Sequence, residues 1–201
     1  MTKDDPKRSR GRPSTLDAEK TLRVAMQAYW TEDPSDISLN EICKRAGVSK
    51  PSLYRGFGSE DGFMRAVLDV YAAEILADAF DVLSRNASLQ ETLDALIQFA
   101  TDDPKMETGC LFYKMRAGKH RLGPLTRERV DEIDAAAIEA YERFFHGRRD
   151  AGDWSGDLPI PVAARYLSEQ IGLAFAQRAA GDDQDQIRNT LELALSVLKG
   201  R

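Results

Sequence analysis

The segment KPSLYR carries side chains whose chemistry suits contact with a nucleic acid. Arg55 offers a guanidinium group, which can donate two parallel hydrogen bonds to a guanine base, and Lys50 adds a second positive charge. Ser52 and Tyr54 lie between them and offer hydroxyl groups that suit phosphate oxygens. This spacing predicts hydroxyl groups that set the register on a DNA backbone and a guanidinium group that reads a base.

These side chains require a short helix held at a fixed angle to another helix. Ser38, followed three residues later by Glu41, predicts a capping box at the start of the first helix. Gly47 predicts its end, because glycine adopts left-handed dihedral angles without a Cβ clash. Ser49 predicts the cap of the second helix, where Pro51 is tolerated in the first turn. The segment therefore predicts a helix-turn-helix that suits the DNA major groove. The residues left to pack it are Val48, Leu53 and Phe57.

The distribution of charge supports this interpretation locally. The whole chain has 28 basic and 33 acidic residues, with a net charge of −5. Residues 42–59 contain no acidic residue, and residues 63–201 hold 17 basic and 23 acidic ones. An acidic body should repel nucleic acid and leave one face to bind it. The basic residues of 42–59 are Lys44, Arg45, Lys50 and Arg55, and those of the first fifteen residues are Lys3, Lys7, Arg8, Arg10 and Arg12.

Length and composition place the chain among ordinary helical proteins. With 201 residues, 42% of them hydrophobic, it can bury one large core or two smaller ones. No signal peptide or membrane-spanning run is visible, and we expect a cytoplasmic protein without contact with a membrane. Cys43 and Cys110 lie in different predicted segments and are interpreted as buried reduced thiols, with redox sensing as the alternative.

Apolar residues recur with helical spacing along most of the chain, and no segment alternates like a strand. We predict an all-α fold of about nine helices. Residues 1–13 form a flexible basic arm, residues 14–62 a three-helix DNA-binding domain, and residues 63–201 a helical effector-binding and dimerisation domain. Outside the helix-turn-helix, the predicted helices cover about 16–30, 59–83, 88–100, 124–146, 160–180 and 183–199, with a short apolar piece at 110–115.

The last two helices carry more apolar surface than one core contact needs. The apolar arc of the last helix covers roughly 200°, whereas a core-facing stripe needs about 100°. We favour a two-fold interface between two copies of the chain, and the alternative is an internal helical hairpin. A dimer also suits DNA, because two recognition helices must lie about one DNA turn apart. The interface candidates are Tyr166, Gln170, Leu173, Ala174, Leu193 and Val197.

The order of these features resembles the N-terminal domain of TetR-family transcriptional regulators. The resemblance runs from Leu22 to Ile75, with AGVSKPSLYRGFGSEDGFMRAVLD at its centre, and the GCLFY stretch at 109–113 is similar to one common in the C-terminal domain. It implies a homodimer that binds a palindromic double-stranded DNA operator. It also implies a repressor that is released when a small-molecule effector enters the C-terminal domain. No cofactor is implied.

The resemblance also assigns roles to the second helix. The positions expected to touch phosphates or base edges are Ser49, Lys50, Ser52 and Tyr54, and base readout is expected at Pro51 and Arg55.

Two departures from the family pattern concern the start of the long helix predicted from Ser59 and the end of the recognition helix before it. Glu60 and Asp61 follow Ser59 where the family often has a lysine near a phosphate, so we exclude both from the DNA site. Gly56 replaces an aromatic residue or histidine and is expected to fray the helix, at a cost of about 1 kcal/mol relative to alanine.

The N-terminal arm contains Arg10-Gly11-Arg12-Pro13, the core of an AT-hook-like segment. Arginines on both sides of a glycine can enter a narrow A·T-rich minor groove. We interpret Arg10 and Arg12 as an auxiliary clamp on DNA, and a solvated tail is the alternative.

Residues that could form an effector site occur in the C-terminal part of the sequence. Aromatic and sulfur-containing side chains in the C-terminal part could line a pocket, although each could equally form core. These candidates are Tyr71, Met106, Cys110, Phe112, Tyr113, Met115, Phe144, Trp154 and Phe175.

Catalysis finds no support in the sequence. His120 and His146 are isolated beside basic residues, and no cysteine and histidine spacing indicates a metal site. Nucleophile elbows, P-loops and dinucleotide fingerprints are absent. We therefore expect a DNA-binding regulator and no enzyme. The alternative is an all-α interaction module whose helix-turn-helix docks on a protein partner.

Overall fold

The computed structural model of the chain describes residues 15–85, 87–156 and 158–199. Helices and short connections account for all of these residues, and none of them forms a strand, which confirms the all-α prediction. Arg10 and Arg12, the predicted arm contacts, lie outside the described residues.

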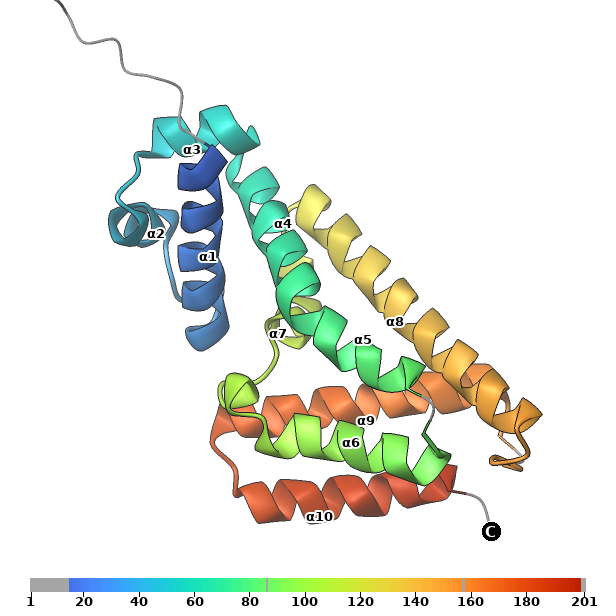
Figure 1. Cartoon of the computed structure of the whole chain (residues 1–201). Helices are drawn as coiled ribbons and strands as arrows, with labels where there is room; N and C mark the ends of the chain where they lie inside the picture. The colour runs from blue at the N-terminus through green and yellow to red at the C-terminus, as the bar shows by residue number, and fades with distance from the viewer. Residues whose placement is uncertain (1–14, 86, 157, 200–201) are drawn as a thin grey trace, which may run out of the picture.

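The N-terminal helices form a small bundle at one end of the molecule (Figure 1). Its core consists of apolar side chains that are almost fully buried, including Ala25, Tyr29, Ile42, Leu53 and Phe63. This burial holds the bundle together, because each large apolar side chain removed from water contributes about 1.5–3 kcal/mol. The helices are α1 (Thr15–Thr31), α2 (Leu39–Ala46), α3 (Lys50–Phe57) and the start of α4 (Glu60–Tyr71).

The long helix predicted from Ser59 is continuous but contains a change of winding. α4 passes into a π-helical turn at Ala72–Leu76 and then into α5 (Ala77–Ser84). In the turn, the N–H of Ala77 donates to the carbonyl of Ala72, five residues earlier. The segment AAEIL contains no proline or glycine, so the sequence did not signal the extra residue in this turn.

The remaining helices form the larger, C-terminal part. Three of them, α6, α9 and α10, run side by side at the base of the molecule, and α8 lies along α4 and α5 (Figure 1). Counted with α4, the π turn and α5 as one helix, the described residues hold nine helices longer than one turn. The C-terminal helices are α6 (Leu89–Asp102), α7 (Leu111–Ala117), α8 (Pro124–Asp150), α9 (Ile160–Ala180) and α10 (Gln184–Leu195).

Helix boundaries differ from the prediction at two places. α8 continues to Asp150 because Gly147 stays within the helix, so the predicted loop at 147–159 is shorter. α10 ends at Leu195 and is followed by a 3-10 turn, Ser196–Leu198. The helix predicted from residue 88 starts with a capping box: the Glu91 carboxylate accepts from the Ser88 N–H at 2.8 Å and the Ser88 hydroxyl accepts from the Glu91 N–H at 3.2 Å.

The end of α1 is tied to the C-terminal part through Trp30. Its indole Nε1 donates to the Gly109 carbonyl at 2.7 Å, and its own carbonyl accepts from Lys114 Nζ at 2.7 Å and from the Thr108 hydroxyl at 3.3 Å. Partial burial lowers the pKa of Lys114. The two parts of the chain are therefore joined by polar contacts as well as by α4.

Two kinds of feature are missing from the described part of the chain. None of its helices combines the length and the apolar character that a membrane crossing needs. Nor do its His, Cys, Asp and Glu side chains form a group of three or more suited to a metal ion.

Gly47 and Gly56 allow a paired test of this fold, because a Cβ at either position would meet no atom within 4 Å. Gly47 has φ 68°, so Gly47→Ala should destabilise the protein by about 1–2 kcal/mol through backbone strain alone. Gly56 lies in α3 without a positive φ, so Gly56→Ala should stabilise it by about 1 kcal/mol. Urea unfolding followed by circular dichroism measures both changes. Shifts of the same sign would contradict the local geometry.

Candidate nucleic-acid interface

The turn between α2 and α3 is built around Gly47. This residue adopts φ 68°, in the left-handed region, and the N–H of Val48 donates to the Cys43 carbonyl at 3.0 Å. The Ser49 hydroxyl then accepts from the Ser52 N–H at 3.3 Å and caps α3. The predicted turn is confirmed, and it fixes the direction in which α3 leaves α2.

The start of α2 differs from the prediction in one bond. The Ser38 hydroxyl accepts from the Glu41 N–H at 3.3 Å as expected, but the Glu41 carboxylate turns to Arg45, whose Nε donates to it at 3.1 Å. The reciprocal half of the predicted capping box is therefore replaced by a salt bridge within α2. The Arg45 guanidinium group also donates hydrogen bonds to both carboxylate oxygens of Glu32 at the end of α1, one of them at 3.2 Å. This arginine is engaged within the bundle and is not a free cation for phosphate.

The outer face of α3 carries the predicted DNA contacts. Leu53 is 3% exposed and packs into the bundle, whereas Tyr54 is 39% exposed. No acidic side chain among the described residues forms a salt bridge with Lys50 or Arg55, so both charges are available to a ligand. The structure brings the six predicted residues of the helix-turn-helix together on α3 and its cap: Ser49, Lys50, Pro51, Ser52, Tyr54 and Arg55.

α3 passes into α4 through a tight connection. Gly58 ends α3, and its N–H donates to the Tyr54 carbonyl at 2.8 Å. α3 thus continues through Gly56 to Phe57, and the fraying expected at Gly56 is not seen, since the backbone bond to Gly58 closes the last turn. A Cβ on Gly62 would lie 2.2 Å from the Phe57 carbonyl oxygen, so only glycine allows α4 to start this close to α3.

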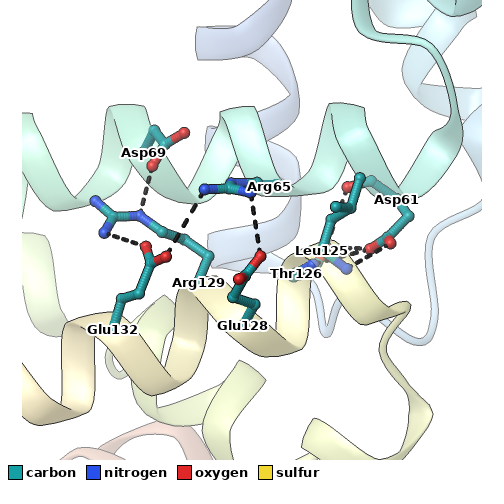
Figure 2. Close-up of polar contacts among 8 residues, drawn as sticks. All are labelled: Asp61, Arg65, Asp69, Leu125, Thr126, Glu128, Arg129 and Glu132. Carbon is teal, nitrogen blue, oxygen red and sulfur yellow. Dashed lines mark hydrogen bonds and ion pairs between the residues drawn. The ribbon is translucent and has the colours of Figure 1, made fainter.

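The N-terminus of α4 meets the N-terminus of α8 at Asp61 (Figure 2). The Asp61 carboxylate accepts from the Leu125 N–H at 2.8 Å, from the Thr126 N–H at 3.0 Å and from the Thr126 hydroxyl at 2.6 Å. Gly123, the residue before α8, has no side chain to cap the helix. Asp61 therefore supplies the cap from another helix. Its exclusion from the DNA site stays a prediction, and the structure gives its carboxylate a different partner.

Salt bridges continue this contact along α4 and α8 (Figure 2). Arg65 lies 3.4 Å from Glu128 and 3.8 Å from Glu132, and Arg129 pairs with Asp69 at 2.5 Å and with Glu132 at 3.0 Å. Most of these side chains are substantially exposed, so each pair contributes little stability by itself. Their alternating order along two helices that run in the same direction fixes the register between them.

The environment of Asp61 favours its charged form. Burial raises the pKa of its carboxyl group, but the hydrogen bonds from Thr126 and Leu125 outweigh this effect, and the pKa lies below its usual value. The positive ends of two helix dipoles act in the same direction. Asp61 thus remains an anion and a strong acceptor at neutral pH.

The effector candidates fall into several places. Three of them, Cys110, Tyr113 and Phe175, line a groove of about 710 Å³ between α7 and α9. Phe112, with Tyr113 and Phe175, also borders a small internal cavity of about 30 Å³. Met115 lines a separate cavity of about 330 Å³ between the N-terminal bundle and α7 and α8, which Asp61 and Gly123 also border.

The other effector candidates take part in core or surface contacts. The Tyr71 hydroxyl donates to Cys110 Sγ at 3.2 Å, and Met106 is fully buried. Trp154 packs on Phe145 with ring centroids 4.7 Å apart, and its indole donates to the Leu198 carbonyl at 2.9 Å. Burial raises the pKa of the Cys110 thiol. Phe144 borders a shallow surface groove beside α5.

Tyr141 is a candidate that the sequence did not single out. It is 6% exposed, borders the internal cavity, and its hydroxyl forms no hydrogen bond with any described residue. Burial raises the pKa of this hydroxyl, so it remains a donor. Its position in the apolar pattern of α8 matches an ordinary core residue, so no sequence signal could have distinguished it.

The interface candidates lie on α9, on α10 and, for Val197, on the 3-10 turn that follows α10, and their exposure is mixed. Leu173 is 50%, Leu193 74% and Val197 56% exposed, which is unusual for large apolar side chains. The Tyr166 hydroxyl donates to the Ala194 carbonyl at 2.9 Å, and Tyr166 and Gln170 are half-buried. Ala174 is 1% exposed and faces the interior of its own chain, so it has no surface for a partner. Val162, at 52% exposed, extends the apolar surface instead.

Comparison with known proteins also relates the N-terminal bundle to DNA-binding regulatory proteins. The family described as "Bacterial regulatory proteins, tetR family" matches residues 22–67. Among curated relatives, an uncharacterised HTH-type transcriptional regulator of Bacillus subtilis, YezE, is 22% identical over 94% of this chain and 99% of its own. The HTH-type transcriptional repressor ComR of Escherichia coli is 38% identical over 65 residues, which cover 32% of this chain and 31% of ComR. The HTH-type transcriptional repressor BdcR, also of Escherichia coli, is 27% identical to this chain over 133 residues, which cover 66% of this chain and 68% of BdcR.

Solved structures extend the similarity of fold to the whole chain. Reduced NemR of Escherichia coli superposes with a TM-score of 0.79 at 20% identity and covers 90% of this chain and 97% of NemR. The TetR-family regulator CifR, in complex with a 26-base-pair operator, gives a TM-score of 0.73 at 22% identity and covers 92% of this chain and 98% of CifR. The capped turn, the polar face of α3 and these similarities lead to one conclusion: the N-terminal bundle is similar to the DNA-binding domain of the tetR family of regulatory proteins, and the chain as a whole shares the fold of solved TetR-family regulators.

Proposed function

We propose that this protein is a homodimeric transcriptional repressor, active in the cytoplasm, that binds a palindromic operator through α3 of each subunit. The observation that carries the proposal is the face of α3, where Lys50 and Arg55 have no acidic partner among the described residues and lie beside the hydroxyl groups of Ser52 and Tyr54. The repressor role is supported by ComR and BdcR, which carry that description. Docking on a protein partner is disfavoured, because the same face matches a family of DNA-binding regulators.

The roles of individual side chains follow from their chemistry. Arg55 reads guanine, because its planar fork fits the two acceptors of that base. Ser49, Lys50 and Ser52, with the Tyr54 hydroxyl, set the position of α3 on the phosphate backbone, and Pro51 lies against the base edges. Arg10 and Arg12 of the arm would add minor-groove contacts.

We also propose that a small-molecule effector releases the operator. The functional boundary would lie near residues 62–63, within α4, so one helix belongs to both domains. The groove between α7 and α9 has a volume in the range of ligand sites and is lined by Cys110, Tyr113 and Phe175. A ligand releases DNA only if it binds the released conformation more tightly than the DNA-bound one.

The second copy of the chain would cover the apolar surface of α9 and α10. Leu173, Leu193 and Val197 expose large apolar side chains on neighbouring helices. A two-fold axis there would bury them isologously and hold two copies of α3 at the spacing of successive major grooves. Tyr166 and Gln170 would lie at the edge of this contact.

Arg55→Ala should abolish sequence preference. We expect the wild type to prefer DNA from upstream of its own gene over a shuffled fragment, and the variant to lose roughly 1–3 kcal/mol of that discrimination. Fluorescence anisotropy at two salt concentrations measures both affinities. Arg143→Ala removes the same charge from the far end of α8 and should bind like the wild type. Equal preference in wild type and Arg55→Ala would refute the role of Arg55.

Leu193→Glu should convert the dimer into a monomer. Leu193 is 74% exposed, so the charge disturbs no intrachain packing but would be buried in the interface. Light scattering after size-exclusion chromatography should give the mass of two chains for the wild type and of one for the variant. Ala136→Glu, at an exposed position of α8, is the control and should stay dimeric. A dimeric Leu193→Glu protein would place the interface elsewhere.

A further inference from the structure

One carboxylate in this protein lies between the N-termini of two helices. Asp61 is in the first turn of α4, and it also receives three hydrogen bonds from the first turn of α8, at 2.8, 3.0 and 2.6 Å. It joins segments that lie more than sixty residues apart in the chain. α8 has no cap of its own, because its N-cap residue is Gly123.

Gly123 is shaped to receive this carboxylate. A Cβ on Gly123 would lie 2.3 to 2.6 Å from the carboxyl carbon and oxygens of Asp61, which is closer than any real contact. The Asp61 carboxylate on α4 therefore fits at the start of α8 only because Gly123 has no side chain. Thr126, which supplies the hydroxyl donor, is fully buried beside them.

The position of Asp61 links this contact to DNA binding. α3 ends at Phe57, four residues before Asp61, and the two connecting residues are held by the Gly58 and Ser59 caps. The N-terminus of α8 is thus fastened almost directly to the end of the recognition helix. With 27 residues, α8 is about 40 Å long. The middle of this helix borders the internal cavity through Ile133, Ala137 and Tyr141.

We infer that Asp61 is a positioning residue for operator binding: by capping α8, it sets the orientation of α3 relative to the C-terminal domain. α8 then acts as a second connection between the two domains, in parallel with α4, and the Arg65, Asp69, Arg129 and Glu132 salt bridges hold the two in register. The inference rests on the operator binding and the dimer proposed above, and it does not require an effector.

A change in the orientation of α3 and a loss of protein stability have different effects on the affinity for DNA. In a dimer, a change in the tilt of α3 alters the spacing between the two recognition helices, so a palindrome is bound less tightly. A single half-site engages one α3 and does not sense that spacing. Loss of folded protein would weaken both kinds of binding equally. The ratio of full-site to half-site affinity therefore separates positioning from stability.

The experiment uses the full-length dimer and DNA selected by the wild type from a random-sequence pool. Asp61→Asn keeps the shape of the side chain but turns an amide N–H₂ toward the N–H groups of α8. Gly123→Ala displaces the same carboxylate from the other side. Both should lose about tenfold in affinity for the palindrome, the size of a lost helix cap, while half-site affinity stays within about twofold.

Gly147→Ala is the matched control, because a Cβ on this glycine of the same helix would meet no atom within 4 Å. It should bind both DNAs like the wild type. If Asp61→Asn fails to fold, Thr126→Val replaces it, since this change removes only the hydroxyl bond and keeps the buried volume. Circular dichroism at the binding temperature establishes that each variant is folded.

The outcomes are distinguishable. Unchanged palindrome affinity in Asp61→Asn and Gly123→Ala would overturn the inference and leave the proposed function intact. An equal loss on palindrome and half-site would also overturn it, because the cap would then act through stability alone. If the wild type selects no sequence, the proposed function fails and the inference fails with it.

Discussion

The burial of one helix between the N-terminal bundle and the C-terminal part is the constraint on which the rest of this structure depends. Phe63, Val67, Leu68 and Tyr71 on α4 are completely buried. α4 packs against α1 in the N-terminal bundle and against α8 in the C-terminal part. Because packed side chains resist small displacements, α4 cannot shift in one part without repacking in the other. A DNA-binding bundle attached in this way is an extension of the C-terminal core and not a module on a flexible linker.

Features set by neighbours in the chain could be predicted from the sequence. Ser49, Ser59 and Ser88 cap the helices that follow them, and Gly47 adopts the left-handed conformation that ends α2. These signals are local, since a cap or a turn needs only three or four adjacent residues. The helix-turn-helix and the position of its polar face follow from them. The apolar spacing of the longer helices was equally visible.

Features set by distant residues could not be predicted. Glu41 had two possible partners, and Arg45 at the next turn prevailed over the Ser38 N–H because it is also anchored by Glu32. Asp61 looked like a residue that stabilises only its own helix, and its partner lies at the start of α8. Neither the π turn nor the place of Tyr141 beside the internal cavity left any mark in the pattern of apolar residues.

The engagement of Arg45 has a consequence for binding to DNA of arbitrary sequence. Arg45 is held by Glu32 and Glu41, and Lys44 lies 3.8 Å from Glu41. Within the part of the chain that the structure describes, Lys50 and Arg55 are therefore the cations of α2 and α3 without an acidic partner. Few counterions are then released when these two helices meet DNA of arbitrary sequence, and the acidic segment of residues 63–201 is repelled. We therefore expect α2 and α3 by themselves to bind DNA of arbitrary sequence weakly, with an affinity that depends only shallowly on salt concentration.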